Sequence, residues 1–214
     1  MDEELTVDTL IAKLKDKDDK VRAAAWQAAG KVGAAAMSAL ATLAKDGAME
    51  VSRSAVRAMW AIVRYAGRPG ADGERKATVD ALIGILSDEG QPVQLRRDVV
   101  WMLSEIVRDE EIGVDGAAQG LANADLREDV RAALQRVGGD KAIAALKAGL
   151  EAAPGDYKPA IAASLRACGV AVPKTKTGDI RCKIEIDPCL AYDVETLRPK
   201  LGKNFRIKGD VLLK

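Results

Sequence analysis

Hydrophobic residues over the first 169 positions recur at spacings of three and four, which is the pattern of helices with one apolar side. In the opening segment TVDTLIAKLKDKDDKVRAAAWQAAGKVG, Leu10, Ile11 and Leu14 form one apolar stripe, and a second stripe runs from Val21 to Val32. The polar turn DKDDK separates them and offers aspartates as helix caps. The segment therefore predicts a short helix, a turn and a second helix that ends near glycine.

This frame recurs about every thirty-odd residues, as in arrays of helical pairs. Further copies are predicted at 34–67, 74–109, 110–138 and 139–169, joined by turns such as KDGAM, SDEGQP and APGD. Pro159 falls in the first turn of the last second helix, where a missing N–H is tolerated. The first helix of the fourth copy contains Gly113, Gly116 and Gly120, each of which weakens a helix by about 1 kcal/mol against alanine. We expect that helix to be short, irregular or mobile.

Two of the predicted second helices carry a resemblance to a known family. The segments DKVRAAAWQAAGKVG and ADLREDVRAALQRVG resemble the second helix of a HEAT repeat, of the short bacterial subtype also found in phycobilin lyases. The resemblance implies an all-α fold, a right-handed α-solenoid of about five HEAT-like helix pairs over residues 1–169. Such families include scaffolds, peptide binders, lyases and DNA glycosylases, so the resemblance predicts the fold rather than the function.

The pattern changes after Gly169. Residues 170–178 are predicted to form a linker, and the stretch DIRCKIEID then alternates apolar and polar residues, as in a half-buried strand. Residues 179–214 are thus predicted to be a short β-rich C-terminal appendage. Three roles are open for it: it caps the last repeat, lies in the groove of the solenoid, or orders on a partner.

Composition and charge narrow the class of protein. The chain is 48% hydrophobic and 30% charged, with a formal net charge of +1, slightly acidic in its body and basic in its tail. A nucleic-acid-binding protein usually has a strong basic excess, so a nucleic-acid partner is disfavoured. The N-terminus is acidic and no long apolar run occurs, which predicts a cytoplasmic protein with no membrane partner.

Several kinds of chemistry lack the residues that they need. The chain has no histidine, and its three cysteines lack the paired spacing of a zinc site. No glycine-rich phosphate loop or nucleophile elbow is present. We therefore predict no catalytic residues, no metal and no cofactor.

Three tryptophans occupy similar places in the second helices, which line the concave face of a solenoid. Trp26 and Trp60 each lie seven residues before a terminal glycine, and Trp101 lies seven before Arg108. Two interpretations are open. Each tryptophan packs against the neighbouring second helix, or the three form an exposed ladder that stacks on a bound peptide or strand.

The second helices also hold most of the arginines. Arg22, Arg96 and Arg127 occupy a recurrent position where we expect bonds to turn carbonyls or to aspartates of adjacent repeats. Five others lie nearer the groove and either receive an acidic partner or form a solvated surface. They are Arg57, Arg64, Arg97, Arg131 and Arg136.

Glu105 lies one helical turn after Trp101. HEAT-like alkylpurine DNA glycosylases use a carboxylate beside a tryptophan on the concave face, which gives the alternative function: a DNA-binding protein or an enzyme of that type. The favoured prediction is a non-enzymatic scaffold whose concave face binds an acidic or extended protein segment, and a purely structural subunit that works through its convex face or its ends is a third alternative. Its predicted site comprises Trp26, Trp60, Trp101, Arg57, Arg64, Arg97, Glu105, Arg131 and Arg136.

Overall fold

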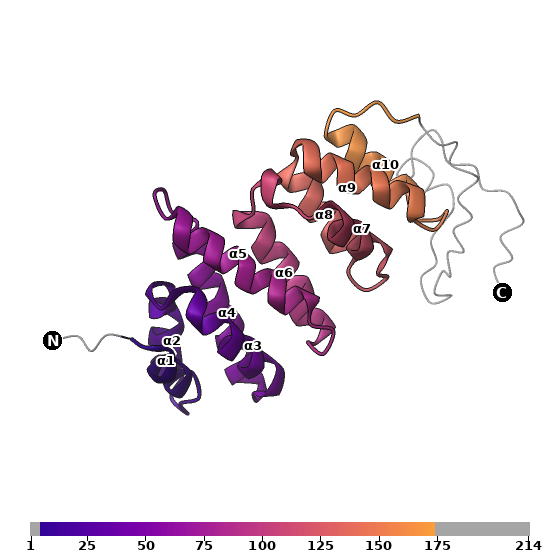
Figure 1. The fold of residues 1–214 in the computed structure, drawn as a ribbon. Coiled ribbons are helices and arrows are strands. Elements are labelled where there is room, and N and C mark those ends of the chain that lie inside the picture. The colour runs from indigo at the N-terminus through magenta and orange to yellow at the C-terminus, as the bar shows by residue number, and fades with distance from the viewer. Residues whose placement is uncertain (1–4, 174–214) are drawn as a thin grey trace, which may run out of the picture. The chain divides into compact units, whose positions relative to one another are not determined.

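A computed structural model describes residues 5–173 of the chain (Figure 1). This part is helical throughout, without a strand, and the predicted helix–turn–helix units are present at the predicted places. The α-helices are α1 (Val7–Leu14), α2 (Asp19–Ala28), α3 (Met37–Asp46), α4 (Met49–Ala66), α5 (Asp72–Ser87), α6 (Val93–Ile106), α7 (Val114–Ala122), α8 (Arg127–Val137), α9 (Gly139–Ala152) and α10 (Lys158–Ala167). Short 3₁₀ segments lie at Ala29–Lys31, Gly33–Ala36 and Asp109–Glu111. The predicted appendage 179–214 and most of the predicted linker lie outside the described residues.

The helices pack in a regular order. Each odd-numbered helix packs on the even-numbered helix that follows it, and α2, α4, α6, α8 and α10 pack on one another in sequence. Among the odd-numbered helices, α1 packs on α3, α3 on α5, and α7 on α9. Contact between α5 and α7 is marginal, so the layer of first helices is interrupted between them.

The hydrophobic core is divided at the same place, between the pairs α5–α6 and α7–α8. One cluster of buried side chains joins α1 to α6, and a second joins α7 to α10 together with Val100 of α6. Leu86 and Val107 are partly buried and pack against both clusters. None of the described helices is both long enough and apolar enough to cross a bilayer.

The glycine-rich helix α7 is short, as the sequence predicted, and two glycines explain its close packing. A Cβ on Gly120 would lie 3.1 Å from Cγ2 of Val130 on α8, and a Cβ on Gly149 of α9 would lie 2.3 Å from Cδ1 of Leu121. These positions let α7 approach both neighbouring helices closely. The predicted place of Pro159 is also confirmed, since α10 begins at Lys158.

Polar contacts link neighbouring helix pairs through the segment between α6 and α7. Arg75 of α5 donates from Nη1 and Nη2 to the Glu111 carboxylate, at 2.6 and 2.9 Å, and from Nη1 to the carbonyl of Ile106 at 3.1 Å. Asp109 accepts from the backbone N–H groups of Lys141 and Ala142, which caps the start of α9. The segment between α6 and α7 is thus held by α5, through Arg75, and by the start of α9, through Asp109.

The three arginines at the recurrent position differ in their contacts. Arg22 donates to the carbonyls of Asp16 and Lys17, and Arg96 donates from Nε to the carbonyl of Leu86, so the prediction is confirmed for these two. Arg127 instead lies over the Tyr157 ring, with Cζ 4.4 Å from the ring centroid. Tyr157 is the N-cap residue of α10, so Arg127 contacts the pair that follows its own and not the turn before its own helix.

Candidate functional site

The candidate site is the row of side chains on α2, α4, α6 and α8 that lie beside the buried stripes of these helices. We call it the second-helix face, and its members are the predicted site residues. Successive second helices pack directly on one another, which places these side chains in consecutive rows. The face comprises Trp26, Arg57, Trp60, Arg64, Arg97, Trp101, Glu105, Arg131 and Arg136.

The first part of the face, on α2 and α4, contains two arginine–tryptophan stacks. Cζ of Arg57 lies 5.8 Å from the centroid of the Trp26 ring, and Cζ of Arg64 lies 5.5 Å from the Trp60 centroid. Both rings are half-buried against the first core cluster, while both arginines are exposed. No carboxylate of the described residues lies within 4.0 Å of either guanidinium group. This part of the face therefore presents positive charge on aromatic supports.

Between α6 and α8, the corresponding arginine and tryptophan, Arg97 and Trp101, are both bound by a carboxylate of the same chain. Asp129 is 8% exposed and accepts from Nε1 of Trp101 at 2.8 Å and from Nε of Arg97 at 2.7 Å. Nearby on α6, burial raises the pKa of Asp98, and the charge of Asp129 acts in the same direction. Asp129 thus fixes the indole of Trp101 and compensates the charge of Arg97, whose side chain is still 44% exposed.

Glu105 and Arg136 form a further link between these two helices. Nη2 of Arg136 lies 2.7 Å from Oε1 of Glu105, and both side chains are about half-exposed. The Glu105 carboxylate is therefore held by an arginine, and the Trp101 N–H group is held by Asp129. The arrangement that would suit a glycosylase requires Glu105 and Trp101 to act on one bound sugar, whereas here each is bound to a residue of α8.

Arg131 belongs to a network between α8 and α10. It donates from Nη1 to Oγ of Ser164 at 2.6 Å and forms an ion pair with Glu128. The hydrogen bond from Arg131 lowers the pKa of Glu128. Burial, followed by the neighbouring Glu128 carboxylate, raises the pKa of Tyr157 to about 12. These groups hold α10 against α8, so Arg131 is only slightly exposed.

The structure thus separates the predicted residues into two sets. Arg57 and Arg64 of α4 are exposed, and they lie over the half-buried rings of Trp26 and Trp60. The remaining arginines are paired with carboxylates of the same chain. Of the two interpretations of the tryptophans, packing against a neighbouring second helix agrees best with Trp26 and Trp101. Trp26 contacts Arg57 of α4, and Trp101 donates a hydrogen bond to Asp129 of α8.

Asp129 and Ser164 were not among the predicted site residues. Both are buried polar side chains on the second helices, and their only sequence signal is a polar residue on an otherwise apolar stripe. The described residues contain no group of three histidine, cysteine or acidic side chains close enough to hold a metal ion.

Comparison with known proteins gave no match to any family model, and none to the curated proteins.

Proposed function

We propose that this chain is a HEAT-like right-handed α-solenoid and that it acts as a non-enzymatic scaffold that binds an acidic, extended protein segment on the second-helix face. The sequential packing of α2, α4, α6, α8 and α10 supports such an arrangement, because a solenoid stacks equivalent helices side by side. The proposal places the binding surface on α2 and α4 and assigns the α6–α8 part of the face to holding the pairs together.

The observation that carries the proposal is the pair of arginine–tryptophan stacks. Stacking on the indole rings holds the Arg57 and Arg64 guanidinium groups while their N–H donors remain exposed. A guanidinium group binds carboxylate through two parallel hydrogen bonds, and little side-chain freedom is lost when the group is already positioned. The site is therefore suited to carboxylate side chains rather than to an apolar ligand.

The spacing of the two arginines indicates the form of the ligand. Arg57 and Arg64 are seven residues apart on α4, about 10 Å along the helix axis at 1.5 Å per residue. An extended chain covers that distance in about three residues at 3.3 Å each. We expect a preference for acidic residues three apart in an extended segment.

A binding titration tests this proposal. The ligand is a fluorescent peptide with glutamates three residues apart, and the protein is the full chain. Replacing both Arg57 and Arg64 with Glu is expected to weaken binding at least about tenfold. The matched control is Lys13→Glu with Lys147→Glu, which changes the net charge equally at exposed positions of the first helices α1 and α9.

The control should bind the peptide as the wild type does. Equal weakening in both double variants would show that the net charge of the protein, and not the second-helix face, governs binding. Duplex DNA is the comparison ligand, since tighter binding of DNA with a steep loss at higher salt would favour the nucleic-acid alternative.

A further inference from the structure

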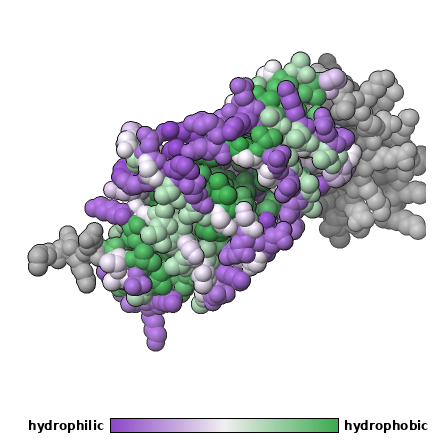
Figure 2. All heavy atoms as spheres, in the orientation of Figure 1, coloured by the Kyte–Doolittle hydropathy of each residue, from purple (hydrophilic) through white to green (hydrophobic). Residues whose placement is uncertain are grey.

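A cavity of about 550 Å³ lies where the layer of first helices is interrupted, between the α5–α6 pair and the α7–α8 pair. Figure 2 shows it as a hollow lined by hydrophobic residues and bordered by hydrophilic ones. Its volume falls within the range of small-molecule sites, roughly 300–1,000 Å³. It lies away from the second-helix face defined above, because its lining comes largely from α5, α7 and the sides of α6 and α8 that meet them.

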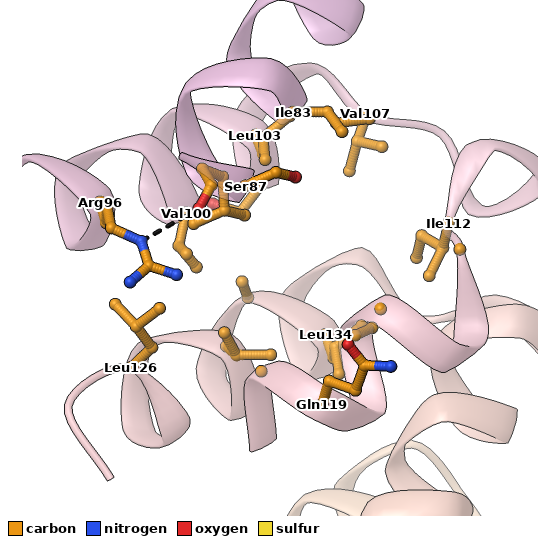
Figure 3. A pocket seen from close by; sticks show the side chains of 18 of the residues that line it. Ile83, Ser87, Arg96, Val100, Leu103, Val107, Ile112, Gln119, Leu126 and Leu134 are labelled. Atoms are coloured by element: carbon orange, nitrogen blue, oxygen red, sulfur yellow. Dashed lines mark hydrogen bonds between the residues drawn. The ribbon is translucent and has the colours of Figure 1, made fainter. Parts of the chain in front are cut away.

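Aliphatic side chains form most of the cavity wall. In Figure 3, Leu103 and Val107 lie along one side, Ile112 lies at one end, and Leu134 lies across from them. Ile83 of α5 also lines the cavity and is 41% exposed, although it is a large hydrophobic residue. An aliphatic surface of this kind favours a hydrocarbon ligand over a polar one.

The cavity persists because α7 is built with small residues on this side. Gly116 lines the cavity, and a Cβ placed on it would have no other group within 4 Å. A larger side chain at this position would project into open space and not into a neighbouring helix. Gly116 is thus a position at which the cavity can be filled without a clash.

One end of the cavity carries a positive charge. Nε of Arg96 donates to the Leu86 carbonyl at 3.0 Å, which holds the guanidinium group beside Val100 and Leu126 (Figure 3). Its terminal nitrogens have no hydrogen-bond partner among the described residues. Ile112 lies at the opposite side in this view.

Two acidic residues also line the cavity. The carboxylate of Glu111 is bound by Arg75 through two hydrogen bonds, so its charge is compensated. Glu89 lies in the exposed turn after α5 and forms no ion pair within the described residues. Arg96 is therefore the group that can pair with an anion. Glu89 opposes it, as does the neighbouring Asp88, whose pKa is lowered by hydrogen bonds from Gln91 and Gly90 and in smaller part by the charge of Arg96.

We propose that this cavity binds an aliphatic molecule that carries a single carboxylate, such as a medium-chain fatty acid. The carboxylate pairs with the terminal nitrogens of Arg96, and the hydrocarbon chain lies against Leu103, Val107 and Leu134. Charge complementarity at one end and the aliphatic wall at the other define this ligand class.

Calorimetric titration of the full chain with dodecanoate, dodecanol and dodecylamine, each below its solubility limit and below any micelle concentration, tests the proposal. Each probe is a linear molecule of twelve carbon atoms, and the head groups are negative, neutral and positive, respectively. Dodecanoate is expected to bind at least about tenfold more tightly than dodecanol, and dodecylamine more weakly than either. Equal affinities for the three probes would overturn the assignment of the head group.

Four variants locate the site. Gly116→Leu should weaken dodecanoate binding at least about tenfold, whereas Gly84→Leu should not, since Gly84 is a helical glycine with equally open surroundings that does not line the cavity. Arg96→Met should remove the preference for dodecanoate over dodecanol, and Glu89→Gln should increase it. Unchanged binding by Gly116→Leu, or a preference unaltered by Arg96→Met, would show that the cavity is not the site.

Discussion

Replacing Arg75 with Met is expected to lower the free energy of unfolding by about 3 kcal/mol at neutral pH, because it leaves a largely buried carboxylate without its partner. The side chains of Arg75 and Glu111 are only 11% and 18% exposed, and Arg75 also binds the Ile106 carbonyl. Methionine keeps the apolar part of the arginine side chain, so the decrease in the free energy of unfolding comes from the missing guanidinium group. Urea unfolding followed by circular dichroism measures the change.

A second pair of the same geometry provides the control. Arg68 binds Glu74 through two hydrogen bonds of 2.8 and 2.6 Å, but these side chains are 37% and 52% exposed. Water screens an exposed pair, so Arg68→Met should lower the stability much less than Arg75→Met does. Equal losses in the two variants would contradict the role assigned to burial.

The contribution of the Arg75–Glu111 pair should also depend on pH. The hydrogen bonds from Arg75 are the largest cause that lowers the pKa of Glu111 to about 2. A lowered pKa in the folded state means that the stabilisation is fully present above the ordinary glutamate pKa of about 4.3. It is lost as the pH falls through about 2, so the difference between wild type and Arg75→Met should shrink across that interval.

Replacing Asp129 with Ala is expected to lower the free energy of unfolding by about 2 kcal/mol, because the indole N–H of Trp101 and Nε of Arg97 lose their acceptor. Asp129→Asn keeps one acceptor oxygen and should cost less. The change should also move the fluorescence maximum of the chain toward longer wavelength as Trp101 gains solvent.

A double-mutant cycle with Trp101→Phe separates this contact from general loss of packing. Because the two side chains share one hydrogen bond, the combined loss should be smaller than the sum of the single losses by about 1 kcal/mol. Strict additivity would show that the bond between Trp101 and Asp129 does not contribute to stability.

The sequence predicted the parts of the fold that depend on local patterns. Apolar spacing located both helices of each pair, glycine content predicted the short α7, and the missing N–H of Pro159 predicted its place at the start of α10. The contacts of Arg22 and Arg96 also follow from local geometry, since their acceptors lie six and ten residues away.

Contacts between pairs could not be predicted in the same way. Arg75 and Glu111 are 36 residues apart, and Trp101 and Asp129 are 28 apart. Their meeting depends on how one pair is rotated on the next, which the side-chain pattern of one pair does not encode. For the same reason, the sequence placed five arginines on the groove side without indicating that Arg97, Arg131 and Arg136 pair with carboxylates of the chain.

The cavity between α5 and α7 was likewise not visible in the sequence. Glycine in α7 predicted a weak helix, but the consequence in the structure is an interrupted layer of first helices with an apolar space behind it. A weak helix and a cavity have the same sequence signal, and only the placement of neighbouring helices distinguishes them.

Binding of acidic segments to the α2–α4 part of the second-helix face can be followed through the indole N–H resonances of the three tryptophans. The full chain is titrated with the glutamate peptide while these resonances are followed by NMR. We expect the Trp26 and Trp60 resonances to shift in proportion to the bound fraction, while the resonance of Trp101, which is held by Asp129, keeps its position. Binding that leaves Trp26 and Trp60 unmoved, or that shifts only Trp101, would contradict this expectation.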